Sequence, residues 1–108
     1  MRFFLGFENM KKFRLPYVEI DEEVGEVIYL GYPLPLTNSE YEVFRIIFCS
    51  TDCISKEDIR EKLHHNAEMS AESIPVHIHN INRKATAAGG GKIIGVKKRS
   101  GYFIIENP

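Results

Sequence analysis

Three consecutive cations, Lys97, Lys98 and Arg99, form the most concentrated charge in the sequence. They lie between two β-prone runs, 92–96 and 102–105, and therefore at the tip of an expected β-hairpin. Cations at such a tip can neutralise phosphates of a polyanion, which gives affinity but reads no base sequence. The alternative is a charged loop that only faces solvent.

A second group of polar side chains precedes this tip, on one side of a helix expected in the segment 74–88. Asn80 can pair with adenine N6 and N7, Arg83 suits guanine or a phosphate, and Val76 can contact a thymine methyl. The same side of the helix also carries Ser73, His77 and Lys84. This pattern predicts a helix able to enter the major groove of a nucleic-acid duplex.

The cysteines and histidines are the candidates for metal or redox chemistry. Cys49 and Cys53 are four residues apart, and core packing of Cys49 is the simpler interpretation. His77 and His79 are two residues apart, so on a helix they point in different directions. A metal-binding sensor would need the cysteines and histidines to converge, and we expect no metal.

Catalytic patterns are weak throughout the sequence. No Ser/His/Asp arrangement has a supporting context, and the glycines 89–91 follow a helix instead of opening one, as a phosphate-binding loop requires. We therefore expect a protein that is not an enzyme and that needs no cofactor.

Length and composition indicate one small globular domain over residues 1–108. The 108 residues are 44% hydrophobic and 27% charged, which excludes a disordered or fibrous chain. No apolar run approaches the ~20 residues that span a bilayer, and the acid at Glu8 comes too early for a signal peptide. Two cysteines without an export signal favour a reducing compartment, so we expect a cytoplasmic protein with no membrane partner.

The formal net charge of −1 hides an uneven distribution. Residues 1–36 carry four bases and six acids, and residues 37–70 carry four bases and seven acids. Residues 71–108 carry six bases and two acids, a net charge of +4. A basic face on an acidic body is what a polyanion would bind, although a solvated charged face remains the alternative.

The first third, residues 1–36, is expected to form antiparallel strands, because its connections are too short for crossover helices. The β-prone runs are 2–7, 13–20 and 26–32.

Residues 37–88 predict three helices. Thr37 with Glu40 forms a capping box for a first helix that ends near Ser50. Ser55 caps a second helix over residues 56 to about 64, and a polar loop, 65–70, follows.

The third helix has an apolar stripe of Ile74, Ile78, Ile81 and Ala85. Pro75 requires that its cap lie nearby, around residues 71–73, and the glycines 89–91 end it. With the hairpin in 89–108, this order predicts an α+β fold: a winged helix–turn–helix with an N-terminal antiparallel sheet, a three-helix core and a C-terminal β-hairpin wing.

Four motifs then resemble the OmpR/PhoB-type effector domain of bacterial response regulators. The run L-T-N-S-E-Y-E-V-F at 36–44 is similar to the family's L-T-x-x-E-x-x-x-L, and S-K-E-D-I at 55–59 is similar to S-R-E-x-L. The segment I-P-V-H-I-H-N-I-N-R-K at 74–84 resembles V-D-V-H-I-x-x-L-R-x-K, and G-Y-F-I at 101–104 resembles G-Y-x-[FL]. The resemblance covers about residues 13–105.

The resemblance implies a sequence-specific DNA-binding transcription regulator of two-component phosphorelay signalling. It further implies binding to direct repeats as a tandem homodimer, and contact with RNA polymerase through the loop before the third helix. By position, the family's DNA-contacting residues fall on Ser73, Val76, His77, His79, Asn80, Asn82, Arg83, Val96 and Lys98. Together with the residue-based analysis, the predicted DNA-contacting set is Ser73, Val76, His77, His79, Asn80, Asn82, Arg83, Lys84, Lys97, Lys98 and Arg99.

The sequence departs from the family where its phosphate contacts lie. The family usually has arginines at the positions of His79, Asn80 and Asn82, and its W-G pair is replaced by histidines at 64–65. The chain is also too short for the family's receiver domain, so we expect either a fragment of a longer regulator or a free-standing effector domain. The alternative function is a winged-helix module that binds protein and has little affinity for DNA.

Overall fold

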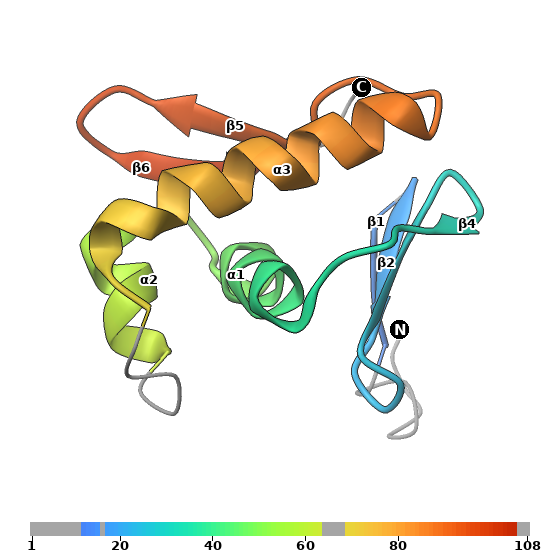
Figure 1. Cartoon of the computed structure of the whole chain (residues 1–108), viewed down its shortest axis with the longest axis horizontal. Helices are drawn as coiled ribbons and strands as arrows, with labels where there is room; N and C mark the ends of the chain where they lie inside the picture. The colour runs from blue at the N-terminus through green and yellow to red at the C-terminus, as the bar shows by residue number, and fades with distance from the viewer. Residues whose placement is uncertain (1–11, 16, 64–68, 106–108) are drawn as a thin grey trace.

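The structure is a computed structural model that describes residues 12–15, 17–63 and 69–105 (Figure 1). An N-terminal four-stranded sheet comprises β1 (Lys12–Leu15), β2 (Val18–Asp21), β3 (Glu26–Tyr29) and β4 (Tyr32–Pro33). Three helices follow: α1 (Asn38–Cys49), α2 (Lys56–Lys62) and α3 (Ile74–Ala87), with a short 3-10 turn, η2 (Ala71–Ser73), before α3. A hairpin of β5 (Ile94–Lys97) and β6 (Gly101–Ile104) follows α3. The expected α+β architecture is confirmed.

The N-terminal sheet is antiparallel in the order β1-β2-β3-β4. Two of the predicted runs are divided: 13–20 holds both β1 and β2, and 26–32 ends at Tyr29 before a turn. Leu30 and Gly31 make that turn with φ of 54° and 87°, and position 16 is a proline, which lacks the N–H that a strand ladder needs. The predicted run 2–7 lies outside the described residues.

The first two helices begin at their predicted caps. The Glu40 backbone N–H donates to Thr37 Oγ1 over 3.1 Å, and the Thr37 N–H donates to Glu40 Oε1 over 3.0 Å, so the capping box is complete. The Asp58 N–H donates to Ser55 Oγ over 3.1 Å at the start of α2. Helix α2 ends at Lys62, with Leu63 as its C-cap, about two residues before the predicted end, and most of the predicted loop 65–70 lies outside the described residues.

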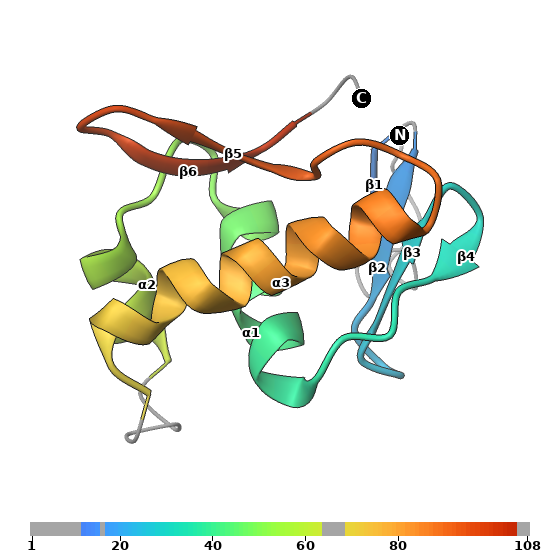
Figure 2. The ribbon, with the colours of Figure 1, turned by 45° about the horizontal axis from the view of Figure 1, so that its top comes forward.

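The core lies where α1 and α3 cross and where both meet the sheet (Figure 2). Phe44 of α1 and the predicted α3 stripe are buried in it, which confirms the period read from the sequence. Tyr29 is fully buried beneath the loop after α3, where its hydroxyl donates to the Gly91 carbonyl over 3.1 Å. A Cβ on Gly90 would overlap that hydroxyl, so this close approach requires glycine.

One core expectation was wrong. Cys49 is exposed at the end of α1, because the helix buries the side that carries Val43 and Ile47 and turns this last residue outward.

The hairpin is anchored to the helical core at its base. Ile54, in the loop between α1 and α2, pairs with Tyr102 of β6: the Ile54 N–H donates to the Tyr102 carbonyl over 3.0 Å, and the Tyr102 N–H donates back over 2.8 Å. β5 starts two residues later than the predicted strand 92–96, at Ile94, because the backbone N–H groups of Ile93 and Ile94 bond to an α3 side chain. No helix in the described part of the chain is long and apolar enough to cross a membrane.

Candidate nucleic-acid interface

Helix α3 has a buried side and a side that faces out of the molecule. Ile74, Ile78, Ile81 and Ala85 lie against the core. On the outward side Val76, His79 and Arg83 are exposed and Asn80 is half-buried, with Val76 58% exposed. These four side chains belong to the predicted set, and the helix brings them together.

Two members of the outward side contact one another. Arg83 Nη2 donates a hydrogen bond to Asn80 Oδ1 over 3.4 Å, a pairing that residues three apart on a helix can make. Ser73, just before α3, is half-buried, and its hydroxyl donates to the Ser70 carbonyl over 2.7 Å.

Asn82 does not belong to the outward side, although the family resemblance placed it among the DNA contacts. Its Oδ1 accepts from the N–H groups of Ile93 and Ile94, each over 2.9 Å, and its Nδ2 donates to the Ile94 carbonyl over 3.0 Å. Both ends of the amide are therefore used to fix the start of β5 to α3. Asn82 positions the hairpin, and the DNA contact predicted for it would require these hydrogen bonds to be shared or broken.

Lys84 is likewise engaged inside the molecule. Its Nζ donates to Glu40 Oε1 over 2.6 Å and to the Pro35 carbonyl over 2.9 Å. Burial raises the pKa of Glu40, but hydrogen bonds from Lys84 and the Thr37 N–H lower it more, so the net pKa lies below its usual value of 4.5. The phosphate contact predicted for Lys84 would therefore compete with these two bonds.

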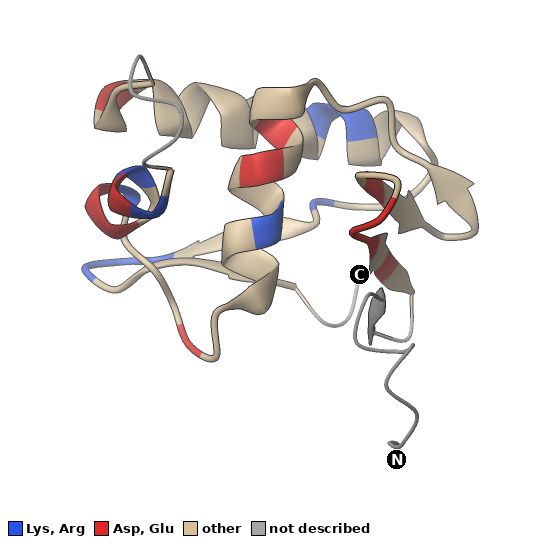
Figure 3. Cartoon of the chain, turned by 90° about the horizontal axis from the view of Figure 1, so that it is seen from below, with Lys and Arg blue, Asp and Glu red and all other residues tan. Residues whose placement is uncertain are grey.

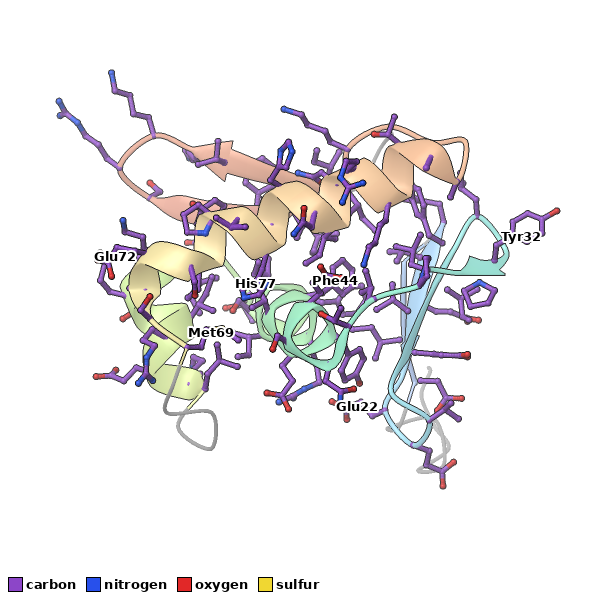
Figure 4. The ribbon with its side chains drawn as sticks, in the orientation of Figure 1. Glu22, Tyr32, Phe44, Met69, Glu72 and His77 are labelled. Atoms are coloured by element: carbon purple, nitrogen blue, oxygen red, sulfur yellow. The ribbon has the colours of Figure 1, made fainter. Side chains whose placement is uncertain are left out.

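His77 lies on the side of α3 that faces α1 (Figure 4). The ring is half-buried, and its Nδ1 is buried with no hydrogen-bond partner among the described residues. The structure therefore separates His77 from His79, which is exposed on the outward side.

The hairpin carries the three cations on the exposed end of β5 and on the tip. Lys97, Lys98 and Arg99 are all exposed, as is Val96 at 68%. The tip is closed by the Ser100 N–H, which donates to the Lys97 carbonyl over 2.9 Å, and Arg99 takes a φ of 70°. The hairpin runs alongside α3, with its tip near the N-terminal end of that helix (Figures 1 and 2).

The opposite side of the molecule is more acidic. Exposed acids lie on α2, which also carries Lys56, Arg60 and Lys62, and in the turn between β2 and β3 (Figure 3). The exposed acids of α2 and of this turn are Glu57, Asp58, Glu61, Glu22 and Glu23. The charge asymmetry read from the sequence is thus also an asymmetry in space.

The described residues offer little for metal chemistry. No cluster of three or more His, Cys, Asp or Glu that could hold a metal ion occurs among them. Cys49 and Cys53 are free and line a shared groove of about 520 Å³ beside Lys62. Partial desolvation of the sulfur, although the residue as a whole is exposed, and the charge of Glu22 raise the pKa of the Cys49 thiol, which lowers its thiolate fraction.

Comparison with solved structures identifies the fold. A redox sensor of the streptococci, of a family that evolved from two-component response regulators, superposes with a TM-score of 0.73 and 20% identity, over 90% of this chain and 42% of that one. The AdeR DNA-binding domain, solved in complex with an intercistronic region, superposes with a TM-score of 0.71 and 18% identity, over 89% of this chain and 100% of that one. The chain has a winged helix–turn–helix fold.

The same winged helix–turn–helix arrangement occurs in the DNA-binding domain of Klebsiella pneumoniae RstA, solved with the RstA box. That structure gives a TM-score of 0.69 and 16% identity, over 90% of this chain and 99% of that one. No protein-family model matches the chain, and no curated protein matches its sequence. The chain spans less than half of the streptococcal sensor but all or nearly all of the two DNA-binding domains.

Proposed function

We propose that this winged helix–turn–helix is a sequence-specific DNA-binding transcription regulator of the response-regulator effector type. Helix α3 enters the major groove, and the hairpin lies on the adjacent backbone or minor groove. The observation that carries this proposal is the position of the cationic hairpin tip beside the outward side of α3, while exposed acids gather on the opposite side.

The electrostatic arrangement suits a duplex. Lys97, Lys98 and Arg99 have exposed side chains on an element that needs no charge for its own packing, so they can approach phosphates at little structural cost. The acids of α2 and the β2–β3 turn face away from that contact and would not repel the polyanion strongly at short range. Two of the solved structures with this fold, the AdeR and RstA domains, are DNA complexes, which supports DNA binding by this chain.

The proposed contact surface is smaller than the set predicted from sequence. Base edges are assigned to the outward side of α3, where Ser73 lies at the N-terminal end, and phosphates to the hairpin. The residues assigned to this surface are Ser73, Val76, His79, Asn80, Arg83, Lys97, Lys98 and Arg99. His77, Asn82 and Lys84 are left out because they face α1 or bond within the fold.

The same proposal covers the cellular location, cofactors and partners of the protein. As a cytoplasmic effector domain, the protein would act without a cofactor or catalytic chemistry of its own. Tandem homodimers on direct repeats and a contact with RNA polymerase remain predictions of the family resemblance. A winged helix that binds only protein is the competing function, and it differs in its response to salt because apolar protein interfaces do not release counterions.

Selection of duplexes from a random pool, followed by affinity measurements over about 50–200 mM salt, tests the proposal. The triple variant Lys97→Ala/Lys98→Ala/Arg99→Ala should lower the magnitude of the slope of log affinity against log salt by up to ~2–3 units, equally on selected and random duplexes. The matched control, Arg45→Ala/Lys62→Ala, removes two cations from α1 and α2 outside the proposed surface and should leave the slope unchanged. Absence of duplex binding by the folded wild type would favour the protein-binding function.

A further inference from the structure

We infer that the outward side of α3 reads a thymine and a guanine about two to three base pairs apart, through Val76 and through the Asn80–Arg83 pair respectively. This inference rests on the proposed DNA-binding function and names the duplex that it would select.

The hydrogen bond between Arg83 and Asn80 sets which groups the pair offers to a base. A guanidinium has donors only, so the atom of the Asn80 amide that faces Arg83 must be its oxygen. The Asn80 nitrogen, with two N–H groups, and the remaining N–H groups of Arg83 are then left to face the groove. The pair presents mainly donors.

This arrangement disfavours the adenine contact expected from the residue type of Asn80. Bidentate pairing with adenine needs the amide oxygen to accept from adenine N6. In the observed pair, an Arg83 N–H takes one of the two lone pairs of Asn80 Oδ1, so adenine N6 would have to donate to the other one beside a guanidinium that is also a donor. Guanine offers two acceptors in the major groove, N7 and O6, and complements the donors of the pair.

Val76 provides the apolar part of the surface. It is 58% exposed and lies on an otherwise polar side of the helix. The one apolar group that a base pair presents in the major groove is the C5 methyl of thymine. Contact with that methyl would remove the exposed side chain from water.

Helix geometry gives the largest spacing that the two contacts can span. At ~1.5 Å of rise per residue, Val76 lies about 6 Å along the axis from Asn80 and about 10 Å from Arg83. Stacked bases are ~3.4 Å apart along one strand, so with α3 lying along the base stack these offsets correspond to about two to three base pairs. A thymine and a guanine at that separation can be contacted by one helix at the same time.

Chemically altered duplexes test the two contacts separately. In the duplex selected from a random pool, replacing one thymine at a time by deoxyuridine removes only the methyl group. Replacing one guanine at a time by 7-deazaguanine removes only the N7 acceptor. Wild-type affinity should fall about fourfold at one thymine, and about tenfold or more at one guanine two to three base pairs away.

Matched variants assign each effect to its residue. Val76→Ala should lose sensitivity to deoxyuridine but keep sensitivity to 7-deazaguanine, and Arg83→Ala should do the reverse. Asn80→Ala and Arg83→Ala should weaken binding less than additively when combined, because each removes part of one donor pair. These side chains lie outside the core, so thermal unfolding of each variant should match wild type and show that folding is intact.

The outcomes separate this inference from the function on which it rests. If no duplex is preferred over random DNA, the proposed sequence-specific function fails. If one duplex is preferred but neither altered base weakens binding, or if the base coupled to Asn80 is an adenine, the thymine–guanine assignment is wrong while DNA binding stands.

Discussion

Lys84 Nζ and Glu40 Oε1 lie 2.6 Å apart and join the C-terminal half of α3 to the first turn of α1. The Glu40 side chain is 5% exposed and the Lys84 side chain 21% exposed, so the pair is largely removed from water. The same carboxylate oxygen accepts from the Thr37 N–H, so one group both caps α1 and holds α3. The contact between α3 and the start of α1 therefore uses the same carboxylate that closes the capping box.

Replacing Lys84 by methionine should destabilise the fold strongly. Lys84→Met leaves the Glu40 carboxylate buried without its cation, and loss of one partner from such a pair costs about 3 kcal/mol. Urea unfolding should show this loss, and Lys84→Met/Glu40→Gln should recover part of it, because a neutral amide needs no counter-charge. An unchanged free energy of unfolding in Lys84→Met would mean that the pair contributes nothing.

Stability should also depend on pH through Glu40. Burial raises its pKa, while the hydrogen bonds from Lys84 and Thr37 and the charge of Lys84 lower it to a net value below the usual 4.5. Because the folded pKa is depressed, this stabilisation is present above the unfolded pKa and is lost as pH falls through the folded pKa. The difference in free energy of unfolding between wild type and Glu40→Gln should therefore shrink between about pH 7 and about pH 3. Parallel pH profiles for the two proteins would contradict the assignment.

The sequence predicts those parts of the fold that rest on short-range patterns. The capping box of Thr37 and Glu40 spans three residues, and the α3 isoleucines recur with the helical period, so both can be identified from the sequence alone. Cys49 shows the limit of this approach: its type favours burial, but its place at the end of α1 exposes it.

The candidate site could be predicted only in part, because only some of its residues are determined by short-range patterns. Exposed cations at a hairpin tip follow from local sequence. The roles of Asn82 and Lys84 depend on partners 11 to 49 residues away, the most distant being the Pro35 carbonyl. No pattern in the sequence distinguishes an asparagine that bonds to β5 from one that faces a groove.

The Asn82 side chain should be more important for stability than its half-exposed position suggests. Asn82→Ala leaves the N–H groups of Ile93 and Ile94 without their acceptor, and both residues are buried, so about 2–3 kcal/mol should be lost. Thr86→Ala, one turn further along and exposed, is the control and should change stability by within ~0.5 kcal/mol. Thermal unfolding of both variants measures the difference, and equal stability would show that the amide is dispensable.

Gly101 should be the least replaceable glycine in the hairpin. Its φ is 122°, and a Cβ there would overlap the backbone carbonyl of Ile54, which pairs with β6. Gly25 is a matched control: its φ is 79°, yet nothing lies within 4 Å of an added Cβ. The free energy of unfolding of Gly25→Ala should therefore fall only by the ~1–2 kcal/mol that a left-handed backbone conformation costs an alanine.

Gly101→Ala should lower the free energy of unfolding more than Gly25→Ala does. In both variants an alanine must adopt an unfavourable φ, but at position 101 the neighbouring backbone must also move to make room for the Cβ. The movement would separate Ile54 from Tyr102 and shift the hairpin relative to α3. Chemical unfolding of both variants, with amide hydrogen exchange at Ile54 and Tyr102, measures the two effects. If the two alanine variants unfold at the same free energy and the exchange at Ile54 is unchanged, the close approach of β6 to the α1–α2 loop does not restrain the hairpin.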